Sequence, residues 1–147
     1  MKTLKHHTIT LSIALLLLPA FLACGGDDTP DEPTAQELAL EVLAGQWTLN
    51  SGGSILLDGR DVSANYPGFA LSFTDGSYTT TNAGELFNAT GTWTWVGDSD
   101  RMITVDDGKQ LNIQILTANE LEFSFQLTGS GGEATGITGS YVVTVTK

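Results

Sequence analysis

The side chains best able to do chemistry in this chain are carboxylates. Two paired carboxyl groups can act as general acid and general base, as they do in glycoside hydrolysis. Five of the six candidates fall in or beside predicted turns, and the sixth, Glu122, points outward from a predicted strand. This placement favours solvated turn residues over a catalytic pair. The candidates are Asp98, Asp100, Asp106, Asp107, Glu120 and Glu122.

The same carboxylates could supply oxygen ligands to a calcium ion, which prefers clustered hard donors. Asp98 and Asp100 lie two apart and Asp106 and Asp107 are adjacent, but no glutamate follows at the spacing of an EF-hand loop. The chain also lacks a glycine-rich phosphate loop in a strand-to-helix setting. The sequence therefore predicts no metal site and no cofactor.

Residues 1–23 have the composition of a secretory signal. Lys2 and Lys5 precede an apolar run from Ile9 to Ala23 that has small residues near its end. The run holds about 15 residues, fewer than the roughly 20 that a membrane-spanning helix needs. We therefore expect an exported protein without a transmembrane segment.

The apolar run ends in Phe21-Leu22-Ala23-Cys24, which resembles the lipobox of bacterial lipoproteins. The resemblance implies cleavage before Cys24 and attachment of fatty acyl chains, such as palmitate, to that cysteine. A single acyl chain holds a protein to a membrane only marginally, whereas two or more anchor it stably. We expect a protein bound to the bacterial outer membrane through lipid on Cys24, with the membrane leaflet left open.

Residues 24–33 are rich in glycine, proline and acidic side chains. Such a segment cannot bury enough apolar surface to order itself, so it is predicted to be a flexible tether. Its acidic cluster also resembles the surface-export tag of some Gram-negative lipoproteins, which implies display on the cell surface. The folded domain is expected to span residues 34–147.

Loss of the signal would change which reactions the chain can support. It would remove His6 and His7 and leave four basic residues against seventeen acidic ones, a net charge of −13. Nucleophilic catalysis of the Ser-His-Asp or Cys-His kind needs a base, and no histidine would remain. The negative charge also argues against a nucleic-acid partner. The sequence therefore predicts a protein that is not an enzyme.

A short helix is predicted at the start of the domain. Thr34 and Glu37 have the spacing of a capping box, and Gly45 is placed to end the helix. Two apolar pairs share helix faces, Leu38 with Val42 and Ala39 with Leu43. So short a helix must dock on the rest of the domain to be stable.

From Gln46 onward, apolar side chains alternate with polar ones, which is typical of half-buried strands. Asp75-Gly76 and Asp107-Gly108 lie between strand segments and supply the positive φ values of tight hairpins. About eight strands joined by short turns predict an all-β antiparallel meander closed into a barrel. The apolar positions are Trp47, Leu49, Phe69, Leu71, Phe73, Trp93, Trp95, Ile103, Val105, Leu111, Ile113, Ile115, Leu121, Phe123, Phe125, Leu127, Tyr141, Val143 and Val145.

Several segments between about residues 43 and 147 are similar to the lipocalin-like domains of small bacterial lipoproteins. They are Leu43–Leu49 with its Gly-x-Trp, Leu57–Val62, Pro67–Gly76, Gly91–Trp93 and Thr138–Lys147. The resemblance implies a lipocalin-like barrel of about eight strands, in some members with a cavity. It implies no particular ligand.

Binding is therefore the expected activity. Small barrels either fill their interior with side chains or hold one small ligand. Six aromatic residues are candidates for contact with an apolar or sugar-like ligand: Tyr66, Phe73, Tyr78, Trp93, Trp95 and Phe125. The alternative is an envelope structural or protein-interaction module in which these rings only fill the core. Two loops, Gly59–Gly68 and Gly129–Gly139, are long enough to form a rim around the barrel mouth.

Overall fold

The computed structural model describes residues 32–106, 108–128 and 138–147. The predicted signal, Cys24, residues 24–31 of the tether, Asp107 and the rim segment 129–137 lie outside the described residues. All the helices and strands described belong to the unit Glu32–Lys147.

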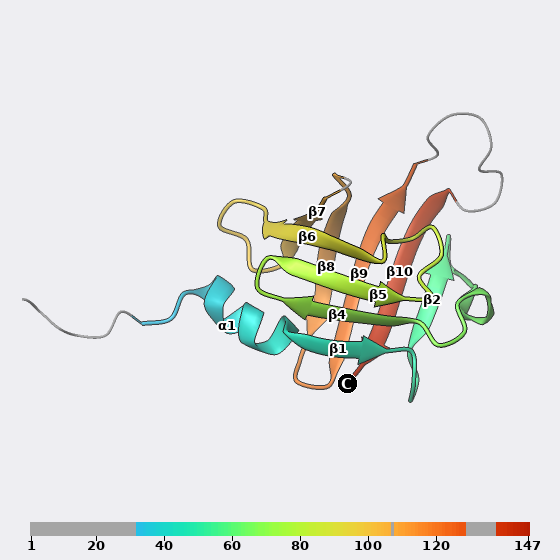
Figure 1. Ribbon diagram of the computed structural model, residues 1–147, viewed down its shortest axis with the longest axis horizontal. Helices are drawn as coiled ribbons and strands as arrows, with labels where there is room; N and C mark the ends of the chain where they lie inside the picture. Colours follow the sequence, from blue (N-terminus) through green and yellow to red (C-terminus); the bar gives the residue numbers. More distant parts are fainter. Residues whose placement is uncertain (1–31, 107, 129–137) are drawn as a thin grey trace, which may run out of the picture. The chain divides into compact units, whose positions relative to one another are not determined.

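The described residues form one α-helix, one short 3₁₀ helix and ten strands (Figure 1). In chain order these elements are α1 (Ala35–Leu43), β1 (Gly45–Thr48), β2 (Ser54–Leu57), β3 (Arg60–Asp61), η1 (Ser63–Asn65), β4 (Ala70–Thr74), β5 (Ser77–Thr81), β6 (Thr90–Trp95), β7 (Met102–Val105), β8 (Gln110–Leu116), β9 (Glu120–Leu127) and β10 (Gly139–Thr146).

Eight of the strands close into an antiparallel barrel. They follow the order β1-β4-β5-β6-β7-β8-β9-β10, and the pairing of Thr48 with Thr146 joins β10 back to β1. In Figure 1, β1, β4, β5 and β6 cross β8, β9 and β10 at a steep angle, so two layers face each other across the core. The predicted all-β barrel with a short helix is confirmed.

The remaining two strands form a hairpin beside β10. Residues Tyr141–Thr144 of β10 pair with β2, and β2 pairs with β3. The predicted loop Gly59–Gly68 is thus partly ordered as β3 and η1. Ser63 fixes this segment, because its hydroxyl accepts a hydrogen bond from the Ile55 amide at 2.8 Å. Its amide donates to the Asp61 carboxylate, also at 2.8 Å.

The alternation of apolar residues places one continuous core inside the barrel. Nearly all of the predicted apolar positions are buried or packed against this core, and among the described residues no polar or charged residue is buried. Ile115 is the exception, because the β8–β9 register shifts between Ile113 and Ile115 and leaves Ile115 only half-buried. A bulge of this kind breaks the two-residue period on which the prediction rested.

Helix α1 begins at the predicted capping box. The Glu37 amide donates to the Thr34 hydroxyl oxygen at 3.2 Å, and the Thr34 amide donates to the Glu37 carboxylate at 2.7 Å. Ala39 and Leu43 form the buried face, whereas Leu38 stays 48% exposed. The Gln36 side chain ties the helix to the β6–β7 turn, where it donates to the Gly97 and Ser99 carbonyls.

The last residue of the chain caps the other end of α1. The Lys147 ammonium donates to the carbonyls of Val42 at 2.6 Å and Ala44 at 2.8 Å. It also lies 4.2 Å from the centroid of the Trp47 ring. A cation at a helix C-terminus and over an aromatic face is stabilising on both counts.

We expect Lys147→Met to lower the free energy of unfolding by about 1 kcal/mol, because both the carbonyl contacts and the cation–π contact are lost. Urea unfolding followed by tryptophan fluorescence measures the change. Lys147→Arg keeps the positive charge and is the matched control. An unchanged midpoint for Lys147→Met would show that the ammonium does not stabilise the fold.

Candidate functional site

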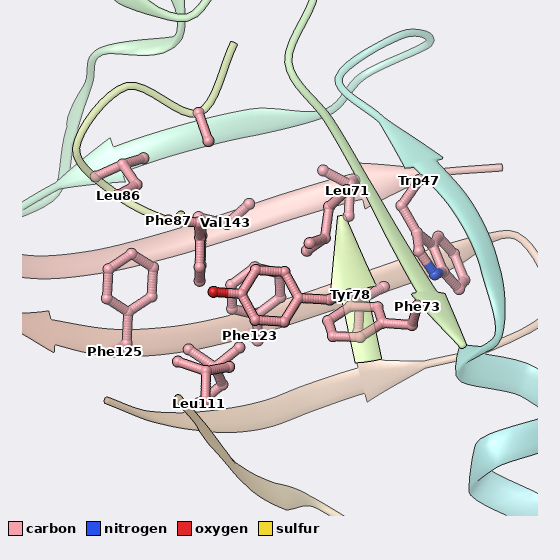
Figure 2. Close-up of a cluster of buried hydrophobic side chains, with 14 of the residues drawn as sticks. Trp47, Leu71, Phe73, Tyr78, Leu86, Phe87, Leu111, Phe123, Phe125 and Val143 are labelled. Carbon is pink, nitrogen blue, oxygen red and sulfur yellow. The ribbon is translucent and has the colours of Figure 1, made fainter. Parts of the chain in front are cut away.

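The structure brings the six predicted ligand-contacting rings together in the barrel core. Tyr66, Phe73, Tyr78, Trp93 and Phe125 are each at most 9% exposed, and Trp95 is half-buried against them. They come from β4, β5, β6, β9 and the segment after η1. Figure 2 shows Phe73, Tyr78 and Phe125 converging on the same interior, together with Phe123 and Trp47.

These rings contact one another closely. Phe73 meets Trp93 edge-on with 6.1 Å between ring centroids, and Trp93 meets Trp95 edge-on at 5.1 Å. Phe125 stacks on Tyr141 at 5.2 Å. Such edge-on and stacked pairs are favourable packing arrangements. The predicted candidates therefore serve one another as packing partners in the buried core.

Phe87 and Leu86 complete this core and were not predicted. They lie in the connection between β5 and β6, outside any regular element, yet both are at most 5% exposed. Phe87 packs against Phe123 and Phe125 with centroid distances of 6.1 and 5.2 Å. The β5–β6 connection thus fills space inside the barrel.

The polar atoms of the buried rings are bound within the protein. The Trp93 indole donates to the carbonyls of Thr74 at 2.9 Å and Ser77 at 3.1 Å, and the Trp47 indole donates to Leu43 at 2.8 Å. The Tyr78 hydroxyl donates to the Asp106 carboxylate at 2.9 Å. These groups stabilise the fold.

One titratable group in the core has a strongly shifted pKa. Burial, followed by the neighbouring Tyr66 phenol and the Asp58 carboxylate, raises the pKa of Tyr141 to about 12. A phenol in this state stays protonated near neutral pH. Tyr141 is therefore suited to hydrogen bonding and packing, and poorly suited to act as a base.

Three of the candidate carboxylates have structural partners within the protein. Asp100 pairs with Arg101 at 3.6 Å, Asp106 accepts the Tyr78 hydrogen bond, and Glu122 accepts a hydrogen bond from Thr144 at 3.0 Å. Asp98 lies in the β6–β7 connection and Glu120 begins β9. Within the residues that the structure describes, no three histidine, cysteine or acidic side chains group together as metal ligands.

A hollow in the described residues lies on the outside of the sheet, over β7–β10. It has a volume of about 650 Å³, and we call it the β7–β10 groove. Strand register builds it, because Met102 lies opposite Asn112 and Asn112 opposite Ser124, while Gln126 lies opposite Ser140. Its lining residues are Met102, Gly108, Lys109, Gln110, Asn112, Ser124, Phe125, Gln126, Leu127, Thr128 and Ser140.

Lys109 is the one charged side chain among the described residues of that lining. Its ammonium donates to the Leu86 carbonyl and lies 4.7 Å from the Phe87 ring centroid and 5.4 Å from that of Phe125. The cation thus links the edge of the groove to the aromatic core. The Lys109 ammonium is therefore already in contact with a carbonyl and two rings of the protein.

A second, smaller hollow of about 270 Å³ lies beside α1. It is largely apolar, with Arg101 and Asp100 at its margin. Its apolar lining residues are Ala35, Leu38, Ala39, Val42 and Leu116. It leaves the exposed part of Leu38 open to solvent.

Comparisons of this chain with protein-family models, with curated proteins and with solved structures found no match. None of the helices in the described ranges has the length and apolar character needed to cross a bilayer.

Proposed function

We propose that the protein is a lipid-anchored envelope lipoprotein whose barrel binds other envelope components through its outer surface and catalyses no reaction. The single observation that carries this proposal is the packed interior, in which buried rings contact one another and their polar atoms are hydrogen-bonded within the protein. A barrel filled in this way supports contact from outside over enclosure of a ligand.

The anchored location rests on the N-terminal sequence. The basic start, the apolar run and Cys24 at its end support export, lipidation with acyl chains and attachment to the outer membrane. The acidic tether supports display at the cell surface. The likeness to lipocalin-like lipoprotein domains belongs to the same proposal and agrees with the eight-stranded barrel.

The second candidate function is binding of a small apolar molecule among the six aromatic rings. The observation in its favour is that Phe73, Tyr78, Trp93 and Phe125 gather in one cluster. The Tyr78 hydroxyl and the Trp93 indole could orient such a molecule, but both already donate hydrogen bonds within the protein. A ligand would have to displace packed rings to enter.

Photo-crosslinking in intact cells tests the proposal. A photoreactive residue is placed at exposed positions on different strands of the full-length protein, Thr79 on β5, Thr94 on β6 and Gln114 on β8. We expect a defined envelope component to be captured from one face.

Native mass spectrometry of the purified protein, mixed with a lipid and glycan extract, is expected to show no retained apolar molecule. Retention of such a molecule, with no capture at any surface position, would overturn the proposal in favour of the second candidate.

A further inference from the structure

We propose that the β7–β10 groove is a binding site for a neutral carbohydrate, such as a short oligosaccharide of uncharged sugars. This inference rests on the proposed function, because it names the surface and the ligand class through which the barrel would bind. It starts from the chemical character of the side chains that the strand register brings together over β7–β10.

Charge is the first observation that selects the ligand class. The chain has seventeen acidic residues and a net charge of −11, yet none of the described residues that line the groove is a carboxylate. A cationic ligand would find no opposite charge there. An anionic ligand would meet only Lys109, which already donates to Leu86 and lies over two rings. The groove therefore suits an uncharged ligand.

Hydrogen-bonding capacity is the second observation. Three carboxamides and three hydroxyls face the groove, and each of these groups can both donate and accept. Among the described residues, the side chains of Gln110, Asn112 and Gln126 are exposed and have no hydrogen-bond partner in the protein. Sugar hydroxyls also donate and accept, so they match such a lining. Met102 and Leu127 add apolar surface for the C–H faces of a sugar ring.

The backbone pairing of the strands under the groove favours a sugar over an extended peptide as the ligand. Peptides are commonly recognised by strand addition at a free sheet edge, where main-chain groups are unpaired. Each of β7, β8, β9 and β10 is flanked by a paired strand on both sides. Only side chains are therefore available to a ligand in the groove, and the amides and hydroxyls there are suited to bind hydroxyl groups.

The size of the groove fits a small ligand of this class. Small-molecule sites commonly measure about 300–1,000 Å³, and the groove measures about 650 Å³. It is the larger of the two hollows described above. The hollow beside α1 has an apolar lining and lacks this set of amides.

The test uses the full-length protein, purified in detergent, on an array of neutral oligosaccharides of hexoses and N-acetylhexosamines. Matched sialylated and sulfated glycans and unmodified peptides are included. We expect binding to at least one neutral glycan, with the Kd raised at least tenfold by the double variant Asn112→Ala/Gln126→Ala. Thr79→Ala/Thr94→Ala, on exposed positions of β5 and β6, is the matched control and should leave the Kd unchanged.

A second variant, Gln126→Glu, keeps the side-chain size but removes the amide donor, and it should also weaken binding. Urea midpoints within experimental error of the wild type show that each variant is folded. Binding to no neutral glycan, equal binding by the groove variants, or a preference for anionic glycans or peptides would each overturn the inference. If photo-crosslinks still form at other faces, only the groove assignment fails and the proposed surface-binding function stands.

Discussion

Replacing Phe123 by alanine will lower the free energy of unfolding by about 3–5 kcal/mol. Phe123 is 1% exposed and its ring packs against Phe87 at 6.1 Å and Phe125 at 6.2 Å between centroids. Removing the ring deletes buried apolar area and leaves a cavity, since the Phe87 and Phe125 rings cannot collapse fully into the space. Equilibrium unfolding in urea measures the loss.

Two further variants separate cavity formation from a general effect of substitution. Phe123→Leu keeps most of the apolar volume and should cost clearly less than the alanine variant. Thr79→Ala changes an exposed residue of β5 and should stay within about 0.5 kcal/mol of the wild type. A loss below about 1 kcal/mol for Phe123→Ala would mean that the interior has spare room. The barrel interior would then have room for a ligand, and the proposed contact through the outer surface would lose its support.

The fold was largely predictable because most of its strands are half-buried. In β9, Leu121, Phe123 and Phe125 are buried, while Glu122, Ser124 and Gln126 are more exposed. Such alternation defines both the strand and its inward face without knowledge of its neighbours. The start of α1 was equally predictable, because the capping box of Thr34 and Glu37 spans only four residues.

The features that sequence reasoning missed depend on contacts with no local pattern. Leu86 and Phe87 lie in an irregular connection, so no periodicity marks them as core residues. Lys147 donates to the Val42 and Ala44 carbonyls at the end of α1, and these residues lie more than 100 positions earlier in the chain. Gly53 is similar, because a Cβ atom there would lie 2.7 Å from the Leu49 Cα and 2.8 Å from the Thr144 carbonyl oxygen. Only the folded chain reveals that close approach.

One part of the candidate site could be anticipated from the sequence, and another part could not. The six aromatic residues all lie in or against one core, and their contact with a ligand stays a prediction. The β7–β10 groove was missed because the outward positions of the strands are mostly polar. The sequence does not give the strand register, which decides which of these positions lie side by side. One signal could have indicated it: Gln110, Asn112 and Gln114 alternate along β8 as an unbroken row of carboxamides, without the charges that occur at Glu120 and Glu122 in β9.

On the proposed lipid anchor, Cys24→Ala will abolish lipidation and with it attachment to the outer membrane. Each buried methylene of an acyl chain contributes about 0.8 kcal/mol, so loss of two or more chains removes nearly all of the affinity for the bilayer. Electrostatic attraction cannot replace it, because the chain carries a net charge of −11 and anionic lipids would repel it. We expect the variant to appear in the soluble envelope fraction or, with its signal uncut, to be held at the inner membrane by the apolar run of that signal.

Fractionation of cells that express the wild type, Cys24→Ala and the neighbouring control Gly26→Ala measures this effect directly. Labelling with an alkyne-tagged palmitate adds an independent readout, which should mark the wild type and Gly26→Ala but not Cys24→Ala. An uncut signal is distinguished from a released protein by its higher mass, since residues 1–23 remain attached. If Cys24→Ala stays in the membrane at its processed mass, the anchor lies elsewhere. The proposed surface contacts would then need a different geometry, because the tether from residue 24 to residue 33 would no longer set the distance of the barrel from the bilayer.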